Sequence, residues 1–406
     1  MGKKLLPVLL GADLNCYGMA CAFYRAFHVR SVVIGQEPLG ATAASRFLRF
    51  VTRPGLGDPL VCLRTLLDFA RETPGCVRLL LPGTDEYARI LIAHRAALSS
   101  AYVLPVPGEQ VLPYFEKDHF YELCEKCGVP YPATRLFHGI PGMEEIRAVG
   151  REYGYPYVLK PACSPDYFHH PFPGIQKVFF VHNPSEAADI FASVAGAGYR
   201  GGMLAQRRIG EGDGDGYVLT VYCDRRGRIA ARACGRVLLE EHTPCGRGNY
   251  AALMTAPVPS VAARIGGLLT AIGYRGFANF DLRRDRDGRF HVLGMNLRPG
   301  RSNHFLTAGG LNPARLVTED AVLGRDLVPT DMTAPLLWRT VPYRTVLRYT
   351  RDPSLREAAA GLHRAGCEAG PWWEEDDLAF NPRRAAYVFL HMRREAEKFR
   401  RYAPLH

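Results

Sequence analysis

The chain has 406 residues, of which 47% are hydrophobic and 22% are charged. This length favours two or three packed units over one, and this composition excludes an intrinsically disordered protein. No apolar run is long enough to span a bilayer, and the N-terminus leads into an expected strand, not a signal peptide. Eleven cysteines without framework spacing indicate a reducing compartment, so we expect a cytoplasmic protein.

The net charge is +11, and the basic residues are mostly arginine, with 44 arginines and seven lysines. A lysine within a motif of so arginine-rich a chain therefore suggests a need for a compact ammonium group. The excess positive charge suits anionic substrates or a membrane surface. No basic-aromatic groove pattern or nucleic-acid-binding motif accompanies it, so we expect no nucleic-acid partner.

Short apolar runs alternate with helical patterns over residues 5–110. Strands are expected at 5–10, 31–35, 77–81 and 102–105, and helices near 15–28, 58–72 and 84–98. This alternation predicts an open α/β sheet with parallel strands, ending at a proline-rich boundary near 105–113. Asp13 and Asn15 follow the first strand and Asp85 the third, where such sheets bind ligands; helix capping is the alternative for each.

Hairpins mark the next part of the chain as α+β. Helices are expected from about 118 and near 143–153, 185–195 and 260–272. Strands are expected at 134–137, 155–160, 177–181 and 203–207, with a hairpin over 216–223 and 228–238. A loop rich in proline, histidine and aromatic residues spans 161–174.

The expected strand pair 276–281 and 291–298 carries the strongest chemical signal. An Asp-Gly pair between the strands favours a tight turn. Asp281 and Asn296 then lie near each other and suit a hard cation such as Mg²⁺, while Arg298 and Arg301 suit phosphate or carboxylate groups. A hairpin with no function beyond structure is the alternative.

The tail from about 331 ends in a helical pattern at 384–402, in which apolar residues alternate with arginines and one lysine. Two interpretations stay open. The helix packs on its own domain, or it contacts a membrane surface.

Several segments, in this order, resemble the ATP-grasp superfamily, and within it the carboxylate–amine ligases of the D-aspartate ligase type, which modify peptidoglycan precursors. They are residues 7–20, Lys160-Pro161-Ala162, Gly248-Asn249-Tyr250, residues 276–281 and residues 296–302. The resemblance implies a Rossmann-like domain at 1–112 and an ATP-grasp domain at 113–330, with α+β subdomains at about 113–200 and 201–330. Residues 331–406 would form a C-terminal extension.

The resemblance also implies site residues for ATP and Mg²⁺. Lys117 and Lys160 would neutralise phosphates, Gln206 and Ile209 would read adenine through their backbone, and Asp213 would hold the ribose. Ser164 would contact phosphate from the loop 161–174, which would close over the site. For Asp213, a loop carboxylate without a ligand is the alternative.

Mg²⁺ would be bound by Asp281 and Asn296. The catalytic residues would be Arg298, Arg301 and Lys160. The substrates, a small carboxylic acid or amino acid and an amine acceptor, would meet Asp13, Asn15, Asp85, Arg301 and Ser302. The reaction implied is carboxylate phosphorylation by ATP, then amide formation, with D-aspartate and a cell-wall precursor amine as first candidates.

The chain departs from the family pattern at two places. Gly294 stands where the family has a metal-bridging glutamate, and Tyr217 stands where it often has an arginine. Single electrostatic groups in active sites are commonly worth about 10²–10³ in rate. An active ligase for D-aspartate, a ligase for another small acid, and a nucleotide-binding pseudo-ligase therefore stay open, as does replacement of the glutamate by Asp213, Asp215 or water.

Overall fold

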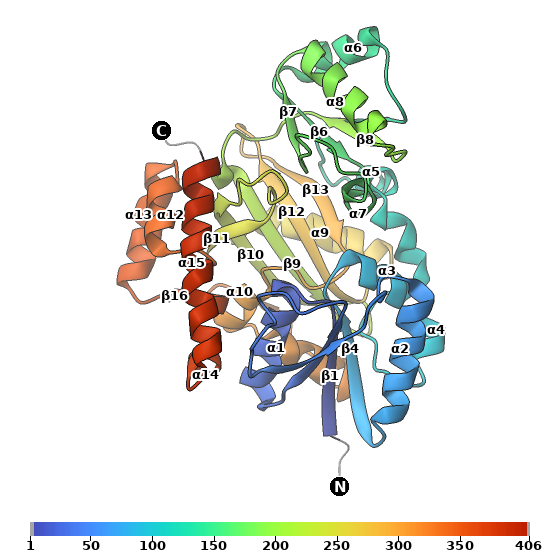
Figure 1. Cartoon of the computed structure of the whole chain (residues 1–406), viewed down its shortest axis with the longest axis vertical. Coiled ribbons are helices and arrows are strands. Elements are labelled where there is room, and N and C mark those ends of the chain that lie inside the picture. The colour runs from blue at the N-terminus through green and yellow to red at the C-terminus, as the bar shows by residue number, and fades with distance from the viewer. Residues whose placement is uncertain (1–3, 404–406) are drawn as a thin grey trace.

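Three β-sheets follow one another along the long axis of the molecule (Figure 1). The computed structural model describes residues 4–403, apart from the side chains of residues 164 and 165. An N-terminal parallel sheet, a large central sheet and a small antiparallel sheet make up the series. This is the ATP-grasp arrangement that the resemblance implied.

The N-terminal sheet is parallel throughout, in the order β3-β2-β1-β4, as predicted. Its strands are β1 (Lys4–Leu10), β2 (Ser31–Gly35), β3 (Leu48–Thr52) and β4 (Cys76–Pro82). Its helices are α1 (Leu14–Phe27), α2 (Pro59–Glu72), α3 (Asp85–Ala93) and α4 (Arg95–Leu98). Strand β3 was not predicted, and the strand expected at 102–105 is reduced to one bridge between Leu79 and Val103.

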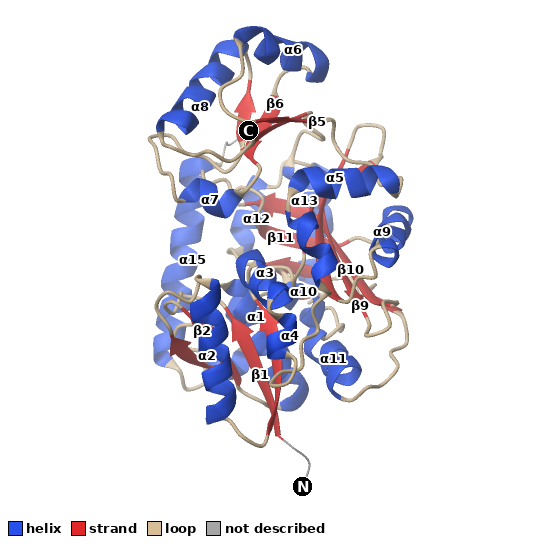
Figure 2. Ribbon diagram, turned by 90° about the vertical axis from the view of Figure 1, so that its right-hand side faces the viewer, coloured by secondary structure: helices blue, strands red, loops and turns tan. Residues whose placement is uncertain are grey.

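The small sheet has the order β5-β8-β6-β7 and only antiparallel pairs. Its strands are β5 (Thr134–Phe137), β6 (Tyr157–Pro161), β7 (Phe179–Val181) and β8 (Met203–Gln206). The helices α6 (Met143–Tyr153) and α8 (Pro184–Gly196) lie together on its outer side (Figure 2). A short helix, α7 (Ser164–Phe168), lies within the expected loop 161–174. The segments η1 (Glu109–Phe115) and α5 (Lys117–Lys126) lead from the N-terminal sheet to this unit.

The central sheet has the order β13-β12-β9-β10-β11-β15-β16, and β14 pairs with β10. Its strands are β9 (Gly216–Cys223), β10 (Ile229–Glu240), β11 (Tyr250–Thr255), β12 (Gly276–Arg284), β13 (Phe290–Asn296), β14 (Thr330–Asp331), β15 (Leu337–Arg339) and β16 (Glu368–Ala369). Both predicted hairpins are confirmed, β9–β10 and β12–β13. The expected division at residue 330 falls within this one sheet.

Two hydrophobic cores cover the two faces of the central sheet. Helix α9 (Pro259–Ala271) and α5 pack on one face. On the other face, α10 (Asn303–Ala308) and α11 (Pro313–Val317) pack together with α1 of the N-terminal unit. The N-terminal sheet is thereby held against the strands that carry the candidate metal ligands.

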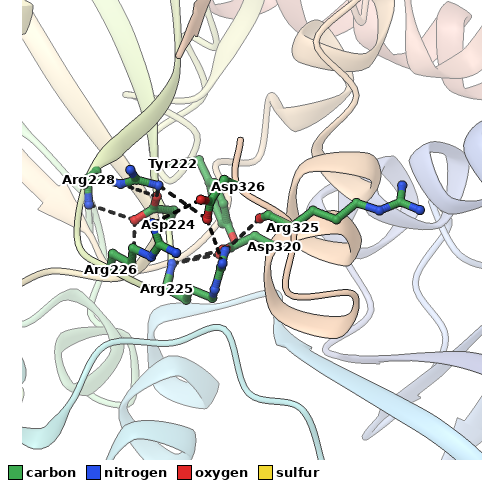
Figure 3. A network of polar contacts seen from close by, with 8 residues as sticks. All are labelled: Tyr222, Asp224, Arg225, Arg226, Arg228, Asp320, Arg325 and Asp326. Atoms are coloured by element: carbon green, nitrogen blue, oxygen red, sulfur yellow. Dashed lines mark hydrogen bonds and ion pairs between the residues drawn. The ribbon is translucent and has the colours of Figure 1, made fainter. Parts of the chain in front are cut away.

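An ion network fixes the β9–β10 turn to the segment after α11 (Figure 3). Asp320 in η3 (Thr318–Val322) is buried and accepts hydrogen bonds from Tyr222 Oη at 2.8 Å and from Arg225 Nη1 at 3.0 Å. Arg225 also donates to Asp326 at 2.7 Å. A buried carboxylate with several donors is a strong positional constraint, so the end of the sheet and the helical layer move together.

The tail folds back over the central and N-terminal sheets (Figure 1). Its helices are α12 (Tyr343–Tyr349), α13 (Pro353–Arg364), η4 (Pro371–Trp373), α14 (Glu375–Leu378) and α15 (Pro382–Tyr402). Helix α15 runs beside the central and N-terminal sheets (Figure 1) and buries Arg384, Val388, Glu395 and Phe399. Within residues 4–403, no helix is both long and apolar enough to cross a membrane.

Arg384 docks α15 on the N-terminal unit. Its Nε lies 3.1 Å from Asp377 Oδ2, and its Nη1 donates to the carbonyl of Ala41 at 2.9 Å. Its guanidinium stacks over Tyr17, whose hydroxyl donates to Asp377 at 2.8 Å. The terminal helix therefore packs on its own chain, while its opposite face remains exposed.

Candidate active site

A cavity of about 390 Å³ lies between the small sheet and the central sheet. Strands β6 and β8 form one wall, and β10, β12 and β13 form the other. Eight lysine or arginine side chains line it against four carboxylates. This excess of positive charge suits a polyphosphate ligand.

Three of the seven lysines of the chain meet in this cavity: Lys117 at the start of α5, Lys160 on β6, and Lys177. Burial lowers the pKa of Lys117, although the carboxylate of Asp281 opposes the shift. Burial, followed by the charge of Lys117, lowers the pKa of Lys160 well below its usual value. A bound polyphosphate would reverse both shifts, because nearby anions favour the ammonium form.

Gln206 lines the cavity and is 2% exposed. Its Oε1 accepts a hydrogen bond from Lys160 Nζ at 2.9 Å, and its Nε2 donates to Tyr121 Oη at 2.9 Å and Thr134 Oγ1 at 2.7 Å. The side chain is thus fully engaged within the protein. Ile209, three residues further on, also lines the cavity.

Asp213 lines the cavity beside the end of β10 and holds a fixed position. Its Oδ2 accepts from the backbone nitrogen of Glu240 at 3.0 Å and lies 2.9 Å from His242 Nε2. Burial acts to raise the pKa of Asp213, but these hydrogen bonds outweigh it and leave the pKa below its ordinary value. An ionised carboxylate that faces the cavity can accept hydrogen bonds from hydroxyl groups.

Asp281 and Asn296 meet on neighbouring strands, as predicted. Asn296 Nδ2 lies 3.4 Å from Asp281 Oδ2, and the hydroxyl of Tyr250 donates to Asp281 Oδ1 at 2.5 Å. Gly294 lies directly opposite Asp281 in the β12–β13 ladder. The amide oxygen of Asn296 accepts from Arg298 Nη2 at 3.5 Å. A carboxylate of Asp281 and an amide oxygen of Asn296 are a fitting donor set for a single Mg²⁺, which needs few protein ligands when phosphates complete its shell.

A second chamber of about 100 Å³ adjoins the first at Tyr250, Asp281 and Asn296. Its basic residues are Lys177, Arg298 and Arg301. Together they make a small anion-binding space beside the metal ligands.

Acidic residues from two other parts of the chain hold the two arginines of this chamber. Arg298 Nη2 lies 2.9 Å from Asp85 Oδ2, and Arg301 Nη2 lies 3.0 Å from Glu241 Oε1. Ser302 beside them is buried and directly precedes α10. The guanidinium groups are therefore positioned before any ligand arrives.

Comparison with known proteins decides the family. The chain is 33% identical to D-aspartate ligase of Enterococcus faecium (strain Aus0004) over 365 residues, which is 86% of each chain. The chain belongs to the ATP-grasp ligases. It is an ATP-dependent carboxylate–amine ligase that forms C–N bonds. No protein-family model matches the sequence.

Solved structures share the fold of this ligase at low sequence identity. L-amino acid ligase from Bacillus licheniformis gives a TM-score of 0.56 with 14% identity, covering 79% of this chain and 75% of the other. The biotin carboxylase domain of Hydrogenobacter thermophilus 2-oxoglutarate carboxylase, solved with MgADP, gives 0.59 with 16% identity, covering 79% and 70%.

Three residues of the ligase that were expected to meet substrate have partners within the protein. Asp85 pairs with Arg298 as described above. Asp13 caps α1 by accepting from the backbone nitrogens of Asn15 and Cys16; burial raises its pKa, and Arg298 and Arg301 oppose the shift. Asp13 therefore caps a helix, which was the alternative prediction, whereas Thr84 caps α3 and Asp85 is the first residue of that helix.

Asn15 is the clearest correction. It is fully buried, and its Nδ2 donates to the carbonyls of Gly83 at 2.8 Å and Pro299 at 2.6 Å. Its Oδ1 accepts from Asn303 at 2.6 Å. Asn15 thus joins the first β–α turn to the arginine loop, and both polar atoms of its buried side chain have partners within the protein.

Three further positions named in the sequence analysis are Ser164, Tyr217 and Asp215. The side chain of Ser164 lies outside the described residues. Tyr217 packs against Phe290 in the core, and Asp215 accepts hydrogen bonds from the backbone of residues 211 and 212. Asp215 therefore does not replace the missing glutamate at position 294.

Two site residues had no role in the sequence analysis: Lys177 and Tyr250. Lys177 was taken as an ordinary strand residue, and only its rarity in this chain could have marked it. Tyr250 belongs to a segment that carried the family resemblance, but its hydrogen bond to Asp281 depends on the unpredicted strand β11.

Proposed function

We propose that this ligase joins D-aspartate to an amine of a peptidoglycan precursor in the cytoplasm, using ATP and Mg²⁺. The observation that carries the proposal is the meeting of two chambers at Asp281 and Asn296. The lysine-lined chamber suits the phosphates of ATP, and the chamber of Arg298 and Arg301 suits a small dicarboxylate. The 33% identity to D-aspartate ligase supports the choice of acid.

The proposed reaction has two steps. A carboxylate oxygen of the acid attacks the γ-phosphorus of ATP, and ADP leaves with the electron pair of the broken P–O bond. The amine nitrogen of the acceptor then attacks the acyl carbon, loses a proton, and phosphate leaves. Lys117 and Lys160 stabilise the charge of the phosphates, and Arg298 and Arg301 orient the acid and its acyl phosphate.

ATP binding is assigned to the two walls of the same cavity. The backbone of Gln206 and Ile209 would face the adenine edge, and Asp213 would accept hydrogen bonds from the ribose hydroxyls. Asp281 and Asn296 would hold Mg²⁺, which offsets phosphate charge during transfer. Ser302 would add a hydroxyl to the acid chamber, whose volume limits the acid to a few carbon atoms.

Hydroxamate formation tests this proposal without the amine acceptor. The protein is incubated with Mg²⁺-ATP, hydroxylamine and D-aspartate, beside L-aspartate and other amino acids. We expect a signal with D-aspartate that Asp281→Asn abolishes. Asp285→Asn is the matched control, because Asp285 lies in the turn of the same hairpin and faces His291, away from the ATP cavity.

The alternative function is nucleotide binding without ligation, and Gly294 is the observation that favours it. A protein that binds ATP but gives no hydroxamate with any acid would support this alternative. A signal with a different acid would keep the ligase reaction and replace D-aspartate as the substrate.

We also propose that the exposed face of α15 contacts an anionic membrane surface, near lipid-linked precursors. Phe389 and Leu390 are 62% and 51% exposed on this face, beside the exposed Arg393 and Arg394. Apolar and basic residues on one helix face suit insertion between anionic headgroups.

Vesicle co-sedimentation tests the membrane proposal. We expect binding to phosphatidylglycerol vesicles but not to phosphatidylcholine vesicles, and loss of binding in Phe389→Ser/Leu390→Ser. These exposed positions are preferable to deletion of residues 384–406, which would remove the buried Arg384. Unchanged sedimentation of the double variant would contradict the proposal.

A further inference from the structure

Position 294 opens directly into the ATP cavity. Gly294 and Asp281 are direct partners in an antiparallel ladder, so side chains at both positions point to the same face of the sheet. A methyl group on Gly294 would lie 3.5 Å from Lys117 Nζ, and no other atom beyond its chain neighbours would lie within 4 Å. The space beside Asp281 is therefore next to an ammonium group.

The donor set around this space serves one divalent cation. A two-metal site holds its ions about 3.5–4 Å apart, and an anionic ligand that both ions share offsets their mutual repulsion. Within residues 4–403, no group of three or more His, Cys, Asp or Glu side chains could hold a metal ion. Asp281 is the one carboxylate that lines both chambers.

The position of Lys117 is fixed by the helix that carries it. Tyr121, one turn further along α5, donates its hydroxyl hydrogen to the carbonyl of Leu293 at 2.9 Å. The same hydroxyl accepts from Gln206 Nε2 at 2.9 Å. Residues four apart share one helix face, so this contact holds Lys117 against β13 beside Gly294.

We propose that the ligase binds a single divalent cation at Asp281 and Asn296, and that the Lys117 ammonium takes the place of a second one. The inference rests on the proposed use of ATP and Mg²⁺. A lysine ammonium is a compact positive charge with three hydrogen-bond donors. It can therefore neutralise the transferring phosphate without a carboxylate that bridges two metal ions. Lys177, which lines both chambers together with Asp281, adds a second positive charge.

Counting bound Mn²⁺ tests this inference. Mn²⁺ is titrated into the protein at saturating ADP and followed by electron paramagnetic resonance, with ADP binding measured separately by calorimetry. We expect one Mn²⁺ for each chain in the native protein. Two Mn²⁺ would overturn the inference. Absence of ADP binding would instead contradict the proposed function, so the two failures are distinguishable.

Variants at position 294 sharpen the test. Gly294→Glu/Lys117→Met supplies a carboxylate and removes the ammonium, so we expect this variant to bind a second Mn²⁺. Gly294→Ala, the matched control, adds a methyl group at ordinary contact distance and should still bind one. A double variant that binds ADP but only one Mn²⁺ would contradict the assignment of Lys117.

Discussion

Tyr250→Phe should weaken divalent-cation binding while leaving the fold in place. The Tyr250 hydroxyl donates to Asp281 Oδ1 at 2.5 Å, and the burial of Tyr250, together with the nearby carboxylate, raises its pKa well above its ordinary value, so it remains a donor. A hydrogen bond to a charged group contributes about 1.5–3 kcal/mol. Loss of a group that orients a metal ligand typically weakens metal affinity by about 10–100-fold.

The assay is Mn²⁺ titration in the presence of saturating ADP. Tyr274→Phe is the matched control, because the Tyr274 hydroxyl is also buried and donates at 2.7 Å, but to the carbonyl of Phe277. We expect the control to change stability and not Mn²⁺ affinity. Equal or tighter Mn²⁺ binding by Tyr250→Phe, or equal weakening in both variants, would refute the assigned role of Tyr250.

Three further predictions concern stability, measured by urea unfolding. Arg384→Met leaves Asp377 buried without its cation and should cost about 3–5 kcal/mol, whereas Arg383→Met on the exposed side of α15 should stay within about 0.5 kcal/mol; equal losses would contradict this. Asp320→Asn should cost about 2–3 kcal/mol by weakening the network of Figure 3, and an unchanged midpoint would argue against it. Burial and basic neighbours lower the pKa of His391 from 6.5 to about 4. Between pH 6.5 and pH 4, the imidazole therefore binds a proton in the unfolded chain but stays largely neutral in the folded protein. Stability should therefore fall by up to roughly 3 kcal/mol as the pH drops from 6.5 to 4, and His391→Gln should flatten that slope.

Most of the sheet framework could be predicted because its strands have local signatures. The β12–β13 hairpin has an Asp-Gly turn, and β1, β2 and β4 are apolar runs between helical patterns. Strand β3 carries Arg49 in its short sequence, and β15 and β16 have three and two residues. Such strands form because they pair with neighbouring strands of the sheet. This is a tertiary effect that local sequence patterns do not indicate.

Some residues of the candidate site could likewise be predicted from the sequence, whereas other contacts depend on the tertiary structure. The family resemblance assigned four residues to one site, and the structure places all four around one cavity: Lys117, Lys160, Asp281 and Asn296. The pairing of Asp85 with Arg298 joins residues 213 positions apart, and no spacing rule links them. Asn15 has the polar side chain expected at a ligand-binding turn, and only the structure shows that its amide is fully engaged by the chain itself.

The docking of α15 has a consequence for the order of folding. The loop at residues 40–46 of the N-terminal unit is completed by Asp377, Ala379 and Arg384, more than 330 positions later in the chain. When the first hundred residues have emerged from the ribosome, the residues that form hydrogen bonds with this loop have therefore not yet been synthesised. The hydrogen bonds of this loop to Asp377, Ala379 and Arg384 cannot form before those residues are synthesised, and contacts of such long sequence separation form slowly. C-terminal truncation should accordingly expose the beginning of the chain to proteases, far from the point of the cut.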